Sequence, residues 1–239
     1  MKACFFAALA LVGLFASPAG AQSAAPDMAP PETWVDHREA MTRLELGYRG
    51  SFVPDQGFDP FSGNDFMPEF YLAASRTVFT SGRFSFAPGV EWDNGGRSSQ
   101  VRQVDTASLR LNRLTVPLEG RVHFGPWGYA FARVAPGVAA LQTQLTDASS
   151  PATLSKTQWL FATDLSAGYA WLLWPRFQAS QLTGRLWLQA DVGYALVAQA
   201  QLNLGPDLGS GNAQRVDGVD LGTLSMNGAF FRISAAASF

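Results

Sequence analysis

Twelve charged side chains stand on alternate positions of apolar segments, and their types limit the chemistry that they can perform. Six are carboxylates and six are arginines: Arg43, Glu45, Arg49, Glu69, Glu91, Glu119, Arg121, Arg133, Asp164, Arg185, Asp191 and Arg232. An enclosed charge has to be paired because an isolated one is costly to desolvate, and arginine binds a carboxylate bidentately. These residues predict a polar network of Arg–carboxylate pairs, with a narrow, gated solute path as the alternative.

Other residue types give little support for catalysis. His37 precedes the first apolar segment and His123 lies near a short turn, and no Ser–His–acid arrangement suits acyl chemistry. We therefore predict that the chain is not an enzyme and takes no cofactor or metal. The acidic loop residues lack EF-hand spacing and are ordinary turn residues: Asp55, Asp59 and Asp65 in one loop, and Asp207, Asp217 and Asp220 in another.

The segments that must position these charges have a hydrophobic period of two. Leu114, Val116 and Leu118 fall on one face, and Arg113 and Glu119 fall on the other. Such a stretch keeps one apolar face as a strand and loses it as a helix. Leu109 and Leu111 alternate in the opposite phase, so we expect a β-bulge near Asn112–Arg113. The alternation recurs around 44–52, 70–76, 84–92, 129–141, 159–171, 186–199 and 231–239, which makes eight strands.

The connections between these strands alternate in length. Short ones are expected at Thr80–Arg83, Gly125–Gly128 and Trp174–Gly184, and long ones at Pro54–Asp65, Asn94–Thr106, Gln144–Lys156 and Leu204–Asn227. Short periplasmic turns and long extracellular loops are typical of outer-membrane barrels. The pattern predicts an all-β fold, a closed eight-stranded antiparallel up-and-down transmembrane β-barrel.

The N-terminal segment has the features of an export signal. Lys2 precedes the apolar stretch 5–15, and a small-x-small cleavage site follows at 19–21. We predict a signal peptide at 1–21, a flexible periplasmic leader at 22–40 and the barrel at 41–239. The single cysteine, Cys4, lies within the predicted signal, so the mature chain is expected to have no disulfide.

The 239 residues are 47% hydrophobic but only 15% charged, with a net charge of −2, which argues against nucleic-acid binding and general disorder. A soluble lipocalin-like barrel would show the same alternation, with its apolar face inside. Aromatic residues near both strand ends favour the membrane, because they form girdles at lipid interfaces. The predicted girdle is Trp92, Phe124, Trp127, Trp159, Trp171, Trp174 and Trp187.

The chain ends in FFRISAAASF, in which Phe231, Ile233 and Phe239 occupy alternate positions. This ending is similar to the C-terminal assembly signal of outer-membrane barrels, and the chain resembles the OmpA/OmpX-type family. The resemblance implies insertion into a Gram-negative outer membrane by the barrel-assembly machinery, contact with lipid and lipopolysaccharide, and surface-exposed loops. Arg97 and Arg102 are expected to face lipopolysaccharide phosphates.

We therefore expect a monomeric outer-membrane protein with a structural or surface-interaction role and a lumen plugged by Arg–carboxylate pairs. A barrel of eight strands is just wide enough for side chains to fill. The alternative is a narrow channel or transporter for small or apolar solutes.

Overall fold

The computed structural model describes residues 42–101, 105–147, 153–179, 182–206 and 218–239. The predicted signal peptide, leader and His37 lie outside these residues, as do Arg102, Asp207 and Asp217. The elements are β1 (Thr42–Phe52), the 3-10 helix η2 (Gln56–Phe58), β2 (Phe66–Arg76), β3 (Phe79–Ser81), β4 (Phe84–Val101), β5 (Asp105–Thr115), β6 (Leu118–Gly125), β7 (Gly128–Asp147), β8 (Thr153–Ala179), β9 (Leu182–Val197), β10 (Ala200–Pro206), β11 (Val219–Leu224) and β12 (Gly228–Ser238).

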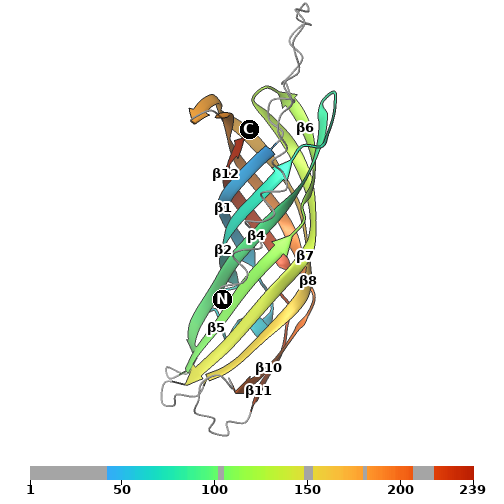
Figure 1. Cartoon of the computed structure of the whole chain (residues 1–239). Helices are drawn as coiled ribbons and strands as arrows, with labels where there is room; N and C mark the ends of the chain where they lie inside the picture. The colour runs from blue at the N-terminus through green and yellow to red at the C-terminus, as the bar shows by residue number, and fades with distance from the viewer. Residues whose placement is uncertain (1–41, 102–104, 148–152, 180–181, 207–217) are drawn as a thin grey trace, which may run out of the picture.

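Antiparallel pairing closes the strands into a ring. The order runs β12–β1–β2–β4, then β5 and β6 together, then β7–β8–β9 and back to β12. β5 and β6 share one position because both pair with β4 and with β7. The seam is made by β1 and β12, which pair from Arg43↔Ser238 to Ser51↔Phe230. The prediction of a closed eight-stranded antiparallel barrel is confirmed (Figure 1).

The two ends of the barrel differ. The C-terminal residue and the hairpins β3–β4 and β6–β7 lie at one end, here named the turn end. The helix η2 and the hairpin β10–β11 lie at the other, the loop end (Figure 1). No helix among the described residues has the length and hydropathy needed to cross a membrane.

The barrel is much taller on one side than on the other. β1, β2 and β12 have 11 residues each, whereas β4 has 18, β7 has 20 and β8 has 27. A tilted strand needs about 9–11 residues to cross a bilayer, so the longer strands continue well beyond it at the loop end. Figure 1 shows β5, β7 and β8 extending there towards β10 and β11.

Longer strands correct three predicted connections, two at the loop end and one at the turn end. The expected loops at Asn94–Thr106 and Gln144–Lys156 are mostly strand, because β4 runs to Val101, β5 begins at Asp105, β7 runs to Asp147 and β8 begins at Thr153. The expected turn at Trp174–Gly184 is also mostly strand. The parts of β4, β5, β7 and β8 that occupy the expected loops are rich in Ser, Thr and Gln. This composition resembles that of a loop, but it also suits a strand whose outer face meets water.

The predicted bulge at Asn112–Arg113 is wrong. β5 pairs continuously with β4 and β7 through these residues, and Leu109, Leu111 and Arg113 all point inward and are buried. The phase reversal in the sequence marks the level at which the inner face changes from apolar to charged. The interruption lies instead between β5 and β6 at Val116–Pro117, because proline has no amide hydrogen for the ladder.

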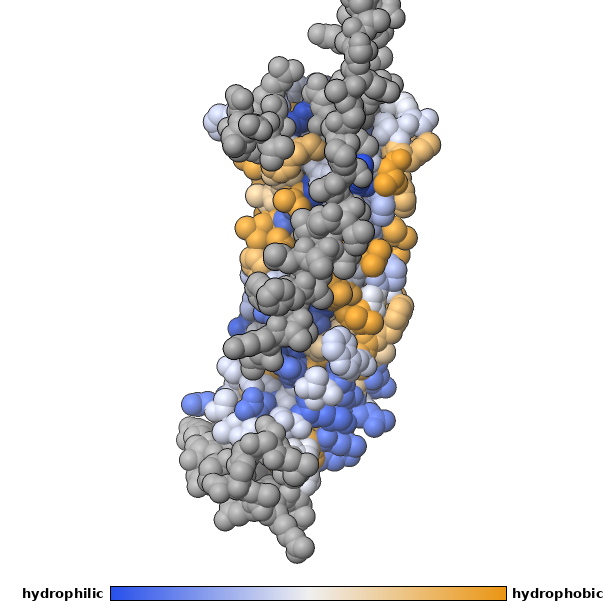
Figure 2. Space-filling model, viewed as in Figure 1, coloured by the Kyte–Doolittle hydropathy of each residue, from blue (hydrophilic) through white to orange (hydrophobic). Residues whose placement is uncertain are grey.

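The outer surface is apolar where the lumen is charged, and hydrophilic where the lumen is apolar. A belt of exposed apolar residues, here named the lipid-facing belt, surrounds the part nearer the turn end: Leu44, Leu46, Tyr48, Phe70, Leu72, Leu114, Val116, Leu118, Val134, Val138, Leu165, Leu188, Val192, Tyr194, Leu196 and Ile233. Figure 2 shows this hydrophobic part above a hydrophilic loop end. The same sheet is therefore polar inside at the level of lipid and apolar inside at the level of water.

Two of the seven predicted girdle residues are placed differently. Phe124, Trp127, Trp159, Trp171 and Trp174 are exposed on the outer surface. Trp92 is half-buried and pairs with Leu72 and Leu114 of the lipid-facing belt, so it lies within the span, because β4 continues past the predicted loop start. Trp187 is buried inside the lumen, since it shares the parity of the inward-facing residues Gln189 and Asp191.

Candidate functional site

The lumen is the candidate site, and its middle section holds the predicted charged network, here named the ion-paired layer. Eleven of the twelve predicted residues are buried, and Arg185 is half-buried. The structure adds Asp93 and Arg113, which are also buried. Asp93 was missed because it adjoins the predicted loop that begins at Asn94, whereas Arg113 was placed on the polar face of its segment but was not included in the predicted network. The two-residue alternation of the strand leads from Glu91 to Asp93 and from Thr115 to Arg113.

Arg232 on β12 joins three other strands. Its Nη1 lies 2.6 Å from Glu91 Oε1 on β4, and its Nη2 lies 2.7 Å from Asp191 Oδ2 on β9. Nη2 also donates to Ser166 Oγ on β8 at 2.9 Å. Arginine is suited to this position because its planar fork presents several donors in fixed directions.

A second centre crosses the barrel beside the first. Arg113 Nη2 on β5 lies 2.6 Å from Glu69 Oε2 on β2, and its Nη1 lies 3.0 Å from Asp164 Oδ1 on β8. Arg49 on β1 donates to Asp164 from the opposite side, and its Nε donates to Ser51 Oγ at 3.0 Å. Each guanidinium therefore bridges strands that are not neighbours in the ring.

A third centre lies around Glu119 on β6. Its two oxygens accept from Arg121 Nε at 2.5 Å and from Arg133 Nε at 2.9 Å. Arg133 Nη1 also donates to Tyr71 OH at 3.1 Å and to Glu91 Oε2 at 3.2 Å. Glu91 thus links this centre to Arg232 by ion pairs, and the ring of Phe230 lies between Arg232 and Arg49 of the second centre.

Three of the carboxylates come close enough together to resemble a metal site. Oxygen atoms of Glu91, Asp93 and Asp164 lie within 4.8 Å of one another. Asp93 Oδ2, however, lies 3.8 Å from Arg49 Nη1 and 3.7 Å from Arg113 Nε. A metal ion at this position would face the same guanidinium groups, so the arrangement favours ion pairing with arginine.

Towards the turn end, aromatic rings and arginines form a second layer, here named the aromatic layer. The guanidinium carbon of Arg43 lies 5.5 Å from the Tyr129 ring centroid and 5.9 Å from that of Trp187, and that of Arg121 lies 5.1 Å from Tyr129. The Tyr129 and Trp187 rings are 5.4 Å apart. Trp187 Nε1 donates to Ser238 Oγ at 2.9 Å, which explains how an indole is accommodated inside the barrel.

The structure also brings Ser85 and His123 together, which the sequence analysis did not foresee. Ser85 Oγ lies 2.9 Å from His123 Nε2, and both side chains are buried. They stand on β4 and β6, which are adjacent in the ring although the residues are far apart in sequence. His123 also lies 5.0 Å from the ring of Tyr129, so this pair belongs to the aromatic layer.

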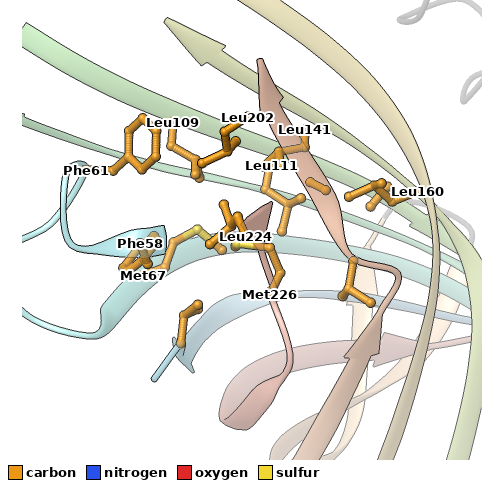
Figure 3. Close-up of a cluster of buried hydrophobic side chains, with 14 of the residues drawn as sticks. Phe58, Phe61, Met67, Leu109, Leu111, Leu141, Leu160, Leu202, Leu224 and Met226 are labelled. Atoms are coloured by element: carbon orange, nitrogen blue, oxygen red, sulfur yellow. The ribbon is translucent and has the colours of Figure 1, made fainter. Parts of the chain in front are cut away.

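At the loop end the lumen holds a third, apolar layer that the sequence analysis did not predict. Its members are buried and come from the strands, from the loop at 53–65 and from the connection between β11 and β12 (Figure 3): Val53, Phe58, Phe61, Met67, Ala107, Leu109, Leu111, Ala139, Leu141, Leu160, Ala162, Val197, Ala200, Leu202, Leu224 and Met226. The phase reversal at Leu109–Leu111 was the signal for it. The acidic residue Asp55 here serves as a cap, since its Oδ1 accepts from Gly57 N at 2.8 Å.

The predicted assembly signal lies on the outer face of the closing strand. Ile233 is exposed, and Phe231 is half-buried against the rings of Tyr48 and Phe66, with centroids at 6.1 and 6.4 Å. Phe239 pairs with Thr42 through two backbone hydrogen bonds, of 2.8 and 3.1 Å. The last residue therefore completes the β1–β12 seam.

Comparisons with known proteins identify the fold. No protein-family model matches the sequence, and no curated protein is significantly similar to it. The attachment invasion locus protein Ail of Yersinia pestis, solved in complex with the heparin analogue sucrose octasulfate, has a TM-score of 0.50 and 10% identity over 84% of this chain and 99% of that one. A second Ail structure has a TM-score of 0.47 and 9% identity over 84% and 98%. The Escherichia coli outer membrane protease OmpT has a TM-score of 0.44 and 9% identity over 87% and 99%. The chain thus has the fold of an outer-membrane β-barrel.

Proposed function

We propose that the chain is a non-enzymatic outer-membrane protein with a structural or surface-interaction role that it performs through its loop end. The observation that carries this proposal is the extension of β4, β5, β7 and β8 beyond the lipid-facing belt, with a hydrophilic outer surface and an apolar interior (Figure 2). Such an extension is stable in water and adds exposed surface that membrane insertion itself does not need.

The proposed orientation places the turn end in the periplasm and the loop end outside the cell. It is supported by the short hairpins at one end and the long extensions at the other, which is the asymmetry of outer-membrane barrels. In this orientation Arg97 lies on the outer side of the membrane, at the level of Leu109 and beyond the lipid-facing belt, and lipopolysaccharide phosphates are its proposed partners. Export through a cleaved signal at 1–21, insertion by the barrel-assembly machinery and a monomeric state complete the proposal.

A closed lumen leads to a conductance prediction. The aromatic, ion-paired and apolar layers lie in series, so we expect no discrete conductance steps when the purified protein is inserted into planar lipid bilayers. Bilayers treated with detergent alone provide the baseline. Reproducible unitary currents would contradict the closed lumen and support the alternative, a narrow channel or transporter.

The role of the C-terminal residue leads to a prediction about assembly. Deletion of Phe239 removes its two backbone hydrogen bonds to Thr42 and the end of the proposed assembly signal. We expect most of the variant to fail to insert, because a barrel in lipid needs every backbone group bonded within the closed sheet. The measurement is the fraction of outer-membrane protein that migrates faster unboiled than boiled on a detergent gel. Phe239→Tyr is the matched control, and wild-type insertion of the deletion variant would reject the signal.

A further inference from the structure

The apolar layer is closed by a loop and not by the sheet. Phe58 and Phe61 are fully buried and belong to the loop at 53–65, here named the roof loop. Figure 3 shows Phe61 beside Leu109 of β5 and Phe58 beside Met67 of β2. On this side of the barrel β1 ends at Phe52 and β12 begins at Gly228, so the roof loop continues from the loop-end edge of the short strands.

The roof loop is built as a self-contained unit. Its stem is closed by Val53 N donating to Asp65 O at 2.7 Å, and its interior by Phe58 N donating to Asp55 O at 2.8 Å and Phe61 N donating to Phe58 O at 2.9 Å. Loops with close ends and internal packing form compact units. These hydrogen bonds survive if the loop moves as one body, and the contacts that such a motion breaks are mainly those of its apolar side chains.

We propose that the apolar layer is a binding site for the hydrocarbon chain of a single-chain fatty acid arriving from the external medium, and that Phe58 and Phe61 occupy the site when no ligand is bound. The two benzyl side chains together contain about fourteen carbon atoms, which matches a tetradecanoyl chain. The rest of the lining is aliphatic, and Met67 and Met226 supply side chains that adapt to different shapes.

The charged surroundings of the site favour a chain with an anionic head. The ion-paired layer lies on the turn-end side of the apolar layer, so a ligand enters from the loop end, beside the roof loop. Beside the end of the roof loop, Arg97 Nε donates to Phe66 O at 2.8 Å, and its guanidinium carbon lies 5.7 Å from the Phe66 ring centroid. A guanidinium carries further N–H donors in a plane that matches a carboxylate. The structure therefore assigns the head group to Arg97.

A glycine in the roof loop provides the test. A Cβ at Gly57 would lie 2.4 Å from Thr223 O on β11 and 3.2 Å from Leu224 Cα, so Gly57→Val forces the roof loop and β11 apart without replacing a side chain of the apolar layer. Gly63 lies in the same loop with no atom within 4 Å of its Cβ position, which makes Gly63→Val the matched control. Both variants of the full chain are reconstituted in lipid nanodiscs and exposed to photoreactive tetradecanoic acid, and labelled residues are mapped by mass spectrometry.

We expect the wild-type protein to be labelled at apolar-layer residues such as Met67, Met226 and Leu111. Gly57→Val should raise this labelling several-fold, Gly63→Val should match the wild type, and Arg97→Gln should lower it several-fold. If Gly57→Val does not fold, as judged by gel mobility, Phe58→Ala/Phe61→Ala replaces it, because it empties the site directly. Nanodiscs expose both ends of the barrel, so the labelling does not depend on which end faces the outside of the cell. A failure of the labelling prediction therefore leaves the proposed orientation unaffected.

Several outcomes would overturn the proposal. Labelling confined to the lipid-facing belt, or equal labelling in the Gly57 and Gly63 variants, would show that the apolar layer is only a core. Labelling by a photoreactive phospholipid of the nanodisc, with none by the free acid, would identify the surrounding membrane as the source of the chain. Unchanged labelling in Arg97→Gln would remove the head-group assignment.

Discussion

Replacement of Arg232 by Met is expected to destabilise the barrel by about 3–5 kcal/mol, because removal of one partner from a buried ion pair leaves uncompensated charge. Arg232 is 1% exposed, and its loss removes the 2.6 Å pair with Glu91 and the 2.7 Å pair with Asp191. Glu91 keeps its hydrogen bond from Arg133, so the charge of Asp191 is the one most affected. The free energy of unfolding is measured by urea titration in lipid vesicles, followed by tryptophan fluorescence.

Two further variants separate charge pairing from general damage. Arg110→Met alters an exposed arginine on β5, and its effect should stay within about 0.5 kcal/mol. Arg232→Met combined with Asp191→Leu should recover at least half of the loss, because an apolar pair can replace a buried ion pair at little net cost. An Arg232→Met variant as stable as Arg110→Met would mean that the network contributes nothing to stability.

Gly193→Val is expected to cost about 3 kcal/mol or more, or to prevent folding, because overpacking forces shifts of neighbouring groups. A Cβ at Gly193 would lie 2.3 Å from Leu165 O and 2.5 Å from Phe230 Cζ. Phe230 has no room to retreat, since the guanidinium carbon of Arg49 lies 3.8 Å from its ring centroid and that of Arg232 lies 5.0 Å away. The glycine therefore makes space for the ring on which the ion-paired layer rests.

The matched control for this glycine is Gly120→Val. Gly120 is also within a strand of the barrel, but it is exposed and no atom lies within 4 Å of its Cβ position. We expect Gly120→Val to refold in vesicles with a free energy of unfolding close to that of the wild type, because valine suits a strand. Equal losses in the two variants would show that the backbone, and not the space for Phe230, sets the requirement for glycine.

Much of the candidate site was predictable from parity along each strand. Arg43, Glu45 and Arg49 point inward because each stands two or four residues from the next, and a strand alternates its side chains strictly. The same rule places Trp187 inside, and the girdle prediction failed there because proximity to a turn was given more weight than parity. Asp93 follows Glu91 in the same alternation, but the predicted strand ended before Asp93 because the residues from Asn94 onward have the composition of a loop.

The apolar layer was harder to predict for a physical reason. Leu109 and Leu111 look misplaced if one solvent surrounds the whole strand, and a bulge is then the simplest explanation. The strand in fact passes from lipid into water, where burial of apolar side chains favours the inner face. A change of phase in the sequence therefore indicates either an irregularity in the ladder or a change of environment, and local pattern does not separate the two.

The sequence by itself determined which side chains share a face, how many strands cross the membrane and that charges turned inward must be paired, because these follow from a period of two and the cost of burying charge. Only the tertiary structure decided which charges meet. Arg232 and Glu91 are 141 residues apart, and Arg113 and Asp164 stand on strands that are not adjacent in the ring. Such partners are set by the stagger of neighbouring strands and by closure of the barrel, which no single segment encodes.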